Sequence, residues 1–449
     1  MKRIHYLILP VLFLLFSGCK KYLEEKSDKK LVVPASLADL QSVLDNYSKN
    51  TFSDLGSGEV STTDYYLTEA NYHALSLESY KRMYTWQKTD VFEPASNEWT
   101  YAYYSIYAAN TVTEGIEKIP RNNTNAQEWD NIKGQALYIR AKTYLSMAYI
   151  WTQAYDENSA NTDLGLPLRL NTNFNEKSTR STLAETYAQI INDLQSSAAL
   201  LPVIPKHLVR PSKPAAHALL ARTYLSMRKY RQAGESASDC LKLFDKLIDY
   251  KQLTATANYP IKMLNQETII YSVIPTPTPL NPTRAKINPD LYTLYSNNDL
   301  RKTVFFKNNN NGSYAFKGNY TGSLAPFGGI STNEVLLIRA EAHARQNRTE
   351  EALKDLNSLL LNRYNSTFIP YSSNSASQAL EWILLERRKE LPLRGLRWMD
   401  IKRLNKEGAN ISLTRTVNGV VYHLPANDPK FALPIPQDVI QLSGMQQNP

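Results

Sequence analysis

Apolar positions recur at helical spacing over most of the chain and predict a mostly α-helical fold. The clearest example runs from Asn97 to Ile119, where apolar and aromatic residues fall every three to four positions. Pro120 follows and lacks the backbone N–H that another turn would need, so this helix is expected to end there. The same spacing predicts helices over Leu37–Tyr47, Glu128–Trp151, Leu183–Leu201, Pro214–Met227, Tyr230–Leu243 and Thr332–Tyr364.

Three of these predicted helices resemble one another in sequence. Residues 138–144 (YIRAKTY) align with residues 219–224 (LLARTY) and with residues 337–343 (LIRAEAH). The small alanines allow close helix packing, and each helix is expected to lead through a short turn into a second helix, as in tetratricopeptide repeats. Because the matches are partial and unevenly spaced, the sequence predicts divergent tetratricopeptide-like helix pairs in one globular domain rather than a regular solenoid.

The helical pattern fades over an irregular, loop-rich insertion at about residues 247–331. Four prolines over residues 275–282 exclude regular structure there, because proline removes a backbone donor and restricts the residue before it. The run Asn308–Gly312 predicts a turn between two strand-like segments, Thr303–Phe306 and Ser313–Phe316. Long irregular segments on a helical scaffold are usually functional, so this insertion is a candidate binding region.

Residues 381–404 (EWILLERRKELPLRGLRWMDIKRL) hold many charges of both signs. Pro392 is expected to end a first helix at Leu391, and Gly395 is expected to form a turn before a second helix. The segment contains no nucleophile and no histidine, so a structural role is favoured over a catalytic one. Its buried or half-buried braces are predicted to be Arg387, Arg388, Arg397 and Trp398.

The N-terminal pattern predicts export and lipidation. Residues 1–18 combine a basic start with an apolar run that is too short for a comfortable membrane span and fits a signal peptide. Ser17-Gly18-Cys19 resembles a bacterial lipobox, whose cysteine is acylated; a plain signal peptide with an incidental cysteine is the alternative. Residues 19–33 are then expected to be a lipidated, charged tether, and residues 34–449 the helical domain.

Composition and charge narrow the function classes. The chain has 449 residues and a formal charge of +9, but its basic residues are scattered, so no nucleic-acid partner is predicted. Tyrosine is abundant, at 29 residues against 12 phenylalanines, and its flat ring with a polar tip suits wet interfaces, sugars and peptides as well as seams between helices. The histidines are scattered and no metal or phosphate motif is present, so no cofactor or metal is predicted.

Residues 381–404 resemble the C-terminal signature of the SusD/RagB family of outer-membrane nutrient-binding lipoproteins, roughly ERR-x-EL-x-x-EG-x-RW-x-DL-x-R. Arg394 stands where the commonest form has Glu, and Pro392 is a second departure. The lipobox, the helix pairs and the closing elements at residues 433–436 (LPIP) and 447–449 (QNP) extend the resemblance over essentially the whole mature chain. The matching signature residues are Glu386, Arg387, Arg388, Glu390, Leu391, Gly395, Arg397, Trp398, Asp400 and Arg403.

The resemblance implies a SusD-like, lipid-anchored protein at the cell surface of the outer membrane. It would capture an oligosaccharide, or in some branches a peptide, and deliver it to a SusC-like TonB-dependent transporter. A second hypothesis is a tetratricopeptide-type protein–protein interaction protein or a structural lid without its own ligand site. Carboxylates such as Asp64 and Glu93 could form a glycosidase pair, but any two acids of a long chain would qualify, so no enzyme activity is predicted.

Ligand contacts are expected on two aromatic, loop-rich stretches. One precedes the first long helix, and the other lies in the irregular insertion. Flat rings can stack on sugar rings or peptide planes while neighbouring polar groups satisfy hydroxyls or amides. Any single ring in these stretches could instead be a packing residue. The predicted ligand-binding residues are Asp64, Tyr65, Tyr66, Trp86, Tyr314 and Tyr320.

Overall fold

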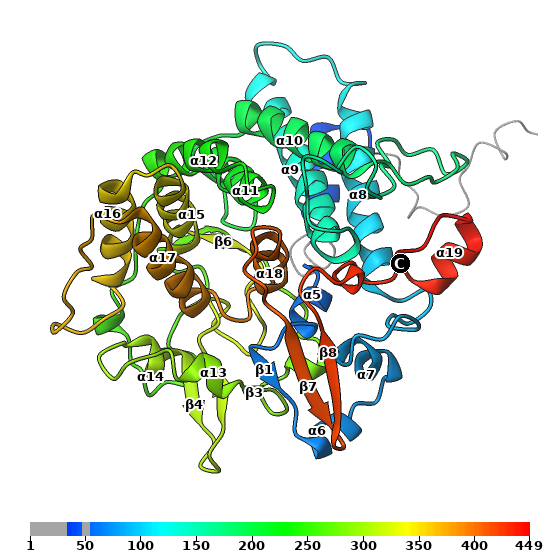
Figure 1. Cartoon of the computed structure of the whole chain (residues 1–449). Coiled ribbons are helices and arrows are strands. Elements are labelled where there is room, and N and C mark those ends of the chain that lie inside the picture. Colours follow the sequence, from blue (N-terminus) through cyan, green and yellow to red (C-terminus); the bar gives the residue numbers. More distant parts are fainter. Residues whose placement is uncertain (1–33, 47–53) are drawn as a thin grey trace, which may run out of the picture.

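The computed structural model describes residues 34–46 and 54–449. Within these residues the long helices form an arc along one side, and most of the short two-stranded sheets lie opposite (Figure 1). Cys19 and the predicted signal peptide and tether lie outside the described residues. The helices are α3 (Leu37–Leu44), α5 (Ser57–Val60), α6 (Glu69–His73), α7 (Glu78–Tyr84), α8 (Glu98–Ile116), α9 (Ala126–Trp151), α10 (Leu183–Leu200), α11 (Lys213–Ser226), α12 (Tyr230–Leu243), α13 (Pro289–Tyr292), α14 (Arg301–Phe305), α15 (Thr332–Arg345), α16 (Thr349–Leu360), α17 (Ala376–Glu390), α18 (Arg397–Asn405) and α19 (Gln437–Ser443).

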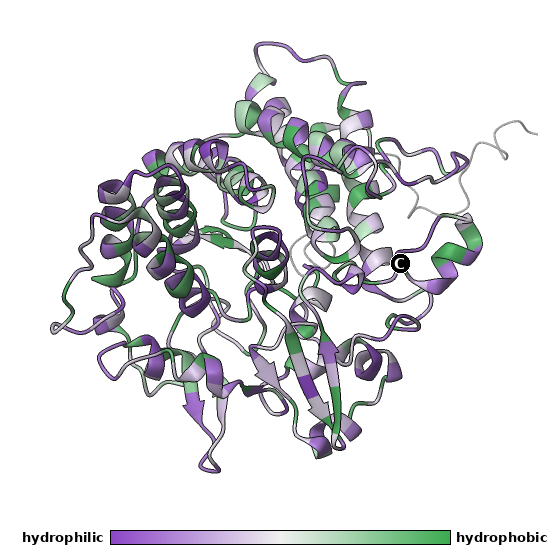
Figure 2. Ribbon diagram, in the orientation of Figure 1, coloured by the Kyte–Doolittle hydropathy of each residue, from purple (hydrophilic) through white to green (hydrophobic). Residues whose placement is uncertain are grey.

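The arc is built by neighbouring helices that pack in order. Helix α8 packs on α9, α9 on α10, α10 on α11, α11 on α12, α12 on α15 and α15 on α16, while α17 also covers α15. Hydrophobic residues are interspersed with hydrophilic ones along each helix, and the buried ones form the core between neighbours (Figure 2). Side-chain caps begin several of these helices, as Asn97 does for α8 and the Thr182–Glu185 capping box does for α10. The mostly helical fold predicted from the sequence is confirmed.

Two of the three predicted helix pairs have the expected short turn. Helices α11 and α12 are joined at Arg228, and α15 and α16 at Asn347, each with a positive φ of about 60°. The structure therefore confirms these two helix pairs. The prediction was wrong for α9, because residues 152–182 separate it from α10 as a long irregular connection.

The irregular insertion holds short strands, and one predicted boundary was wrong. The segment Arg301–Phe305 is helix α14, so the first strand begins only at Phe306. The side chain of Asp299 accepts from the backbone N–H of Arg301 and so favours a helical turn there. The strands are β1 (Tyr65–Tyr66), β2 (Thr268–Ile270), β3 (Lys286–Ile287), β4 (Phe306–Asn308), β5 (Tyr314–Phe316), β6 (Ile330–Ser331), β7 (Leu413–Val417) and β8 (Val420–Leu424).

The hairpin β7–β8 was not among the sequence predictions, although the sequence carries its signal. Asn418 and Gly419 join the two strands, and both have positive φ, at 51° and 73°. An Asn-Gly pair between alternating apolar and polar residues is a strong hairpin pattern. Along β7 the side chains alternate between buried and exposed, which directs Arg415 into the protein.

The charged segment at residues 381–404 folds as predicted. Helix α17 ends at Glu390, two residues before Pro392, and Gly395 has a positive φ of 72° ahead of α18. Arg387 and Trp398 are buried, and Arg388 and Arg397 are partly buried. Arg387 pairs with Asp400, and the indole of Trp398 donates to the carbonyl of Phe431 at 3.1 Å. These residues are therefore the structural braces that the sequence predicted.

Candidate ligand-binding face

The two predicted ligand regions meet through the strand pair β1–β3. Tyr65 and Tyr66 pair in antiparallel register with Ile287 and Lys286, and β3 in turn contacts β5. The side chain of Asn288 donates to the carbonyl of Thr63 at 2.8 Å and extends this junction. A single hydrophobic cluster contains buried rings from both regions. The loop-rich face is here defined as strands β1, β3, β4 and β5 with helix α13 (Figure 1).

Two of the predicted ligand contacts enclose an arginine of the protein itself. The guanidinium of Arg415 lies 3.6 Å from the ring centroid of Tyr84, 5.0 Å from that of Trp86 and 5.2 Å from that of Tyr65. It also donates to the carbonyls of Val60, Thr62 and Tyr84. Because Arg415 fills the space between these rings, Tyr65 and Trp86 form an intramolecular aromatic box and offer no face to a ligand.

Asp64 and Tyr320 are also occupied inside the protein. Asp64 accepts from Arg388 at 2.9 Å, with Arg397 at 3.8 Å. The hydroxyl of Tyr320 donates to Glu267 at 2.6 Å. Together with Tyr65 and Trp86, these residues expose at most 3% of their surface. Asp64, Tyr65, Trp86 and Tyr320 are therefore buried and used by internal partners in this structure, and their predicted ligand contacts stay a prediction.

Tyr66 and Tyr314 remain half-buried on the loop-rich face. Strand alternation turns Tyr66 outward while Tyr65 points into the core. Tyr314 stacks on Tyr292, with ring centroids 3.7 Å apart and planes within 15° of each other. The ammonium of Lys302 lies 5.4 Å from the centroid of Tyr292. The stacked pair is a rigid aromatic platform with a cation beside it.

Sequence reasoning missed Tyr292, which the structure places in this platform. Its helix α13 begins with Asn288 as N-cap and Pro289 in the first turn, which is a recognisable helix start. That signal locates the helix but does not reveal the stacking, since Tyr292 and Tyr314 come from separate elements. Hydrophilic residues dominate the neighbouring hairpin β4–β5 (Figure 2).

A buried network of charges lies behind the loop-rich face. Arg301 pairs with Asp299 at 2.8 Å and with Glu390 at 3.0 Å, and Arg363 bridges Glu390 and Glu267 at 2.7 Å each. The arginine partners hold the pKa of Glu390 below its usual range although burial opposes this. The complete network consists of Glu267, Asp299, Arg301, Arg363, Glu386, Lys389 and Glu390.

Glu59 lies beside the turn before α18, and its pKa is raised above the usual value for a glutamate. Its carboxylate accepts from the backbone N–H of Gly395 at 2.8 Å. Burial and the nearby charge of Asp64 raise the pKa of Glu59 to about 8, against smaller opposing effects of its hydrogen bonds and of Arg397. The folded protein therefore keeps a proton on Glu59 at pH values where the unfolded chain has lost it.

The stability of the protein is consequently expected to fall as pH rises from about 4.5 to about 8, by up to about 4 kcal/mol from Glu59 alone. Glu59→Gln keeps the shape and removes this titration, so the variant should gain stability relative to wild type at pH 8.5 and match it near pH 5. Urea unfolding at both pH values measures the difference. Glu128→Gln on the surface is the control, and an equal difference at both pH values would refute the assignment.

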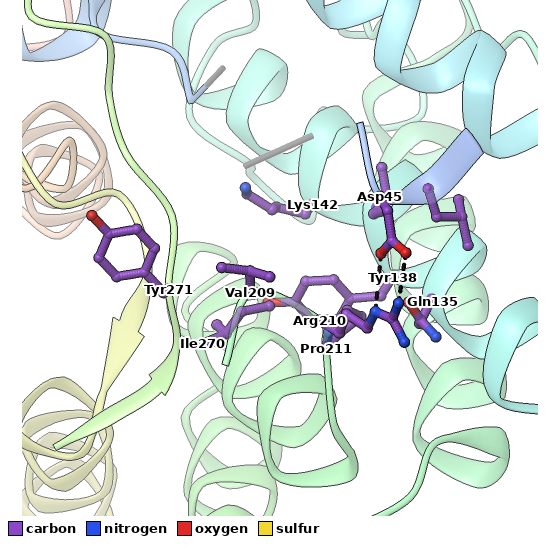
Figure 3. Close-up of a pocket in the computed structure, with 11 residues that line it drawn as sticks. Asp45, Gln135, Tyr138, Lys142, Val209, Arg210, Pro211, Ile270 and Tyr271 are labelled. Carbon is purple, nitrogen blue, oxygen red and sulfur yellow. Dashed lines mark hydrogen bonds and ion pairs between the residues drawn. The ribbon is translucent and has the colours of Figure 1, made fainter. Parts of the chain in front are cut away.

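A separate pocket lies between α9 and the segment before α11 (Figure 3). Asp45 and Arg210 form a two-point ion pair across it, at 2.9 and 2.6 Å. Tyr138 and Tyr271, which also line it, are buried. None of the predicted ligand contacts lines this pocket, so it is distinct from the loop-rich face.

Two further observations concern the described residues alone. No group of three or more His, Cys, Asp or Glu side chains there is arranged to hold a metal ion. No helix in that part of the chain combines the length and the apolar character that crossing a membrane requires.

Comparison with known proteins identifies the family. A family model described as "Starch-binding associating with outer membrane" matches residues 21–225, and the model of the SusD family matches residues 307–449. The second match includes the whole charged signature at residues 381–404. The chain belongs to the SusD/RagB family. No curated protein matches it significantly.

Solved SusD-like structures share the fold over nearly the whole chain. A candidate sugar-binding protein from Bacteroides vulgatus superposes with a TM-score of 0.77 at 23% identity, covering 93% of this chain and 99% of its own. A SusD superfamily protein from Bacteroides thetaiotaomicron gives 0.75 at 23% identity, covering 92% and 100%. A SusD-like carbohydrate-binding protein from Bacteroides vulgatus gives 0.68 at 20% identity, covering 91% and 96%. At these identities the matches establish the SusD-like fold.

Proposed function

We propose that this SusD-like protein is a lipid-anchored binding protein at the cell surface. It captures an oligosaccharide and delivers it to a SusC-like TonB-dependent transporter in the outer membrane. The observation that carries the proposal is the match of residues 21–225 to a family model described as starch-binding and associated with the outer membrane. Two of the similar solved proteins are described as sugar- or carbohydrate-binding, which supports a glycan over a peptide.

The ligand is proposed to stack on the exposed rings of the loop-rich face. Tyr66 and the Tyr292–Tyr314 platform are half-buried, so each ring has both a fixed position and an accessible surface. A tyrosine ring held in this way loses little conformational freedom when a sugar ring stacks on it, and its hydroxyl can bond to sugar hydroxyls. Stacking of a glycan on fixed tyrosine rings requires no catalytic group. The proposed activity is therefore capture of the glycan rather than its hydrolysis.

Glycan and peptide arrays on the lipid-free protein test this proposal. Tyr314→Ala and Tyr66→Ala are each expected to lower the affinity for the retained glycan about tenfold, which corresponds to about 1.4 kcal/mol per ring. Tyr314→Phe should keep most of the affinity because stacking survives. Tyr259→Ala, a partly exposed ring of the same insertion, is the matched control. A protein that binds no glycan but still associates with its transporter would be a structural lid, and the capture proposal would fail.

Lipidation at Cys19 is expected to account for membrane attachment. Two or more acyl chains anchor a protein stably in a membrane, whereas a single acyl chain gives only marginal membrane binding. Cys19→Ala in the full chain should therefore move the protein from the membrane pellet to the soluble fraction after cell fractionation. A Cys240→Ala variant controls for loss of a thiol, since Cys240 is buried in the core. Membrane attachment that persists in Cys19→Ala would contradict the lipobox.

A further inference from the structure

A row of exposed aromatic rings lies on helix α8 and continues onto the long connection between α9 and α10. On α8, Tyr101, Tyr104 and Tyr107 are each between 39% and 50% exposed. They are three positions apart, so each is a neighbour of the next along the helix surface. Phe174, on the connection, is 79% exposed and stacks on Tyr107, with ring centroids 4.9 Å apart and planes inclined by 28°. These four rings are called the α8 aromatic surface.

The α8 aromatic surface is separate from the Tyr292–Tyr314 platform. Helix α8 lies at the upper right of Figure 1, and helix α13, which carries Tyr292, lies at the lower left. Single exposed apolar side chains are ordinary on a soluble protein. A continuous group of exposed rings is not, and such groups commonly mark a binding surface.

Hydrogen bonds within the chain hold the loop that carries Phe174. The guanidinium of Arg169 donates to two backbone carbonyls of this loop. The backbone N–H of Thr172 donates to Glu114 of α8 at 2.8 Å and so ties the loop to the helix. A ring that is exposed and also fixed in place loses little conformational freedom when a ligand stacks on it.

Uncharged polar groups surround the rings of this surface. Asn173 and Asn175 flank Phe174 in the sequence, and both are exposed. Each tyrosine of the row adds a hydroxyl, and that of Tyr101 shares a hydrogen bond of 2.6 Å with Ser96. Flat rings with amides and hydroxyls beside them suit a sugar chain, because the rings stack on its apolar faces and the polar groups bond to its hydroxyls.

Charges near the rings are few and mostly paired inside the protein. Glu98 accepts hydrogen bonds from the N-terminal end of α5. Arg169 lies 3.9 Å from Glu176. Lys177 is exposed three positions after Phe174. The surface is therefore complementary in charge to a neutral chain rather than to a nucleic acid or a strongly charged peptide.

We propose that the α8 aromatic surface is a second glycan-binding surface, which holds a neutral polysaccharide by stacking on Phe174 and the tyrosines of α8. The inference rests on the proposed glycan capture and extends it to a separate place on the molecule. A polysaccharide that contacts this surface and the loop-rich face together is held more tightly than by either alone, because the second contact is intramolecular. A short oligosaccharide gains no such advantage.

Native gel electrophoresis of the lipid-free protein through soluble neutral polysaccharides tests this surface. The probes are amylopectin, galactomannan and xyloglucan, and the one that retards the wild type most is used for the variants. The double variant Tyr66→Ala/Tyr314→Ala, which removes rings of the loop-rich face, should keep part of the retardation. Adding Phe174→Ala to it should abolish the rest.

Single substitutions measure the contribution of the Phe174 ring. Phe174→Ala alone should weaken binding of the polysaccharide about fivefold. Phe174→Tyr should bind like the wild type, because a flat ring remains. Ile369→Ala is the matched control, since Ile369 is 83% exposed on a loop beyond α16, and it should leave binding unchanged. The exposure of Phe174 means that its removal should cost little stability, which thermal unfolding checks.

The outcomes separate this inference from the proposed function. If Phe174→Ala binds like its parent in both backgrounds, the second surface is overturned, while capture on the loop-rich face stands. If none of the neutral polysaccharides retards the wild type, the inference is overturned, and the glycan array decides whether capture fails as well. If Phe174→Ala keeps full glycan binding but no longer associates with the transporter, the rings contact a protein, and the inference is again overturned.

Discussion

Arg301→Met is expected to lower the free energy of unfolding by about 3–5 kcal/mol, the range for breaking a buried ion pair. The substitution keeps most of the side-chain volume but removes a guanidinium that is fully buried. Asp299, Glu386 and Glu390 would each lose a partner and remain in the interior. The unfolding midpoint in urea and the extrapolated free energy measure this loss.

The pH dependence of the Arg301→Met effect distinguishes lost charge pairing from lost packing. Arg301 helps to lower the pKa values of Asp299 and Glu390 against the effect of burial, so without it both values should rise in the folded state. The gap between wild type and variant should therefore shrink as pH falls from 7 to 5. Arg231→Ala, at an exposed pair, is the control and should cost less than about 0.5 kcal/mol. A gap that is independent of pH would point to packing instead.

Arg415→Ala is expected to cost about 2–4 kcal/mol and to loosen the hairpin β7–β8 from the body of the protein. The change removes the Arg415 hydrogen bonds to the carbonyls of Val60, Thr62 and Tyr84, of which Val60 keeps its bond from the hydroxyl of Tyr65. It also empties the aromatic box around the guanidinium. Trp86 lies within that box, so its fluorescence should shift toward that of a solvated indole. Urea unfolding followed by fluorescence measures both effects.

Thr416→Ala is the matched control for Arg415→Ala, because Thr416 is exposed on the neighbouring position of the same strand. Arg415→Lys keeps the charge but loses the planar fork, so its loss of stability should be intermediate. If Arg415→Ala leaves stability unchanged but abolishes glycan binding, then the aromatic box belongs to the ligand site, and the assignment made from its burial is wrong.

Local sequence signals located most helices and their ends. The stretch from Tyr230 to Leu243 was predicted with the bounds that the structure shows. Pro392 and Gly395 restrict or free the backbone only at and next to their own positions. The helix end and the turn that they cause could therefore be predicted from the sequence without knowledge of the fold. The same locality explains the wrong strand start before Phe306, since a short apolar run fits a strand or a helix equally well until its tertiary contacts decide.

The candidate site was only partly predictable because burial depends on distant partners. An aromatic, loop-rich stretch has the same sequence pattern whether its rings face solvent or the interior. Trp86 is enclosed by Arg415, and Asp64 is neutralised by Arg388, which lies 324 positions along the chain. Tyr66 and Tyr314 remain half-buried, Tyr66 on the outward side of strand β1 and Tyr314 stacked on Tyr292.

The sequence by itself determined the helical scaffold, the bracing segment at residues 381–404 and the family resemblance, because spacing, caps and turn residues act over a few positions. Only the tertiary structure decided which aromatic rings are accessible, since that choice depends on arginines from the C-terminal part of the chain. It also decided that Arg394 is buried against Ser331, Tyr320 and Phe327, which come from a distant part of the chain. Charge balance in an interior is a property of residues brought together from several helices, and no local pattern specifies it.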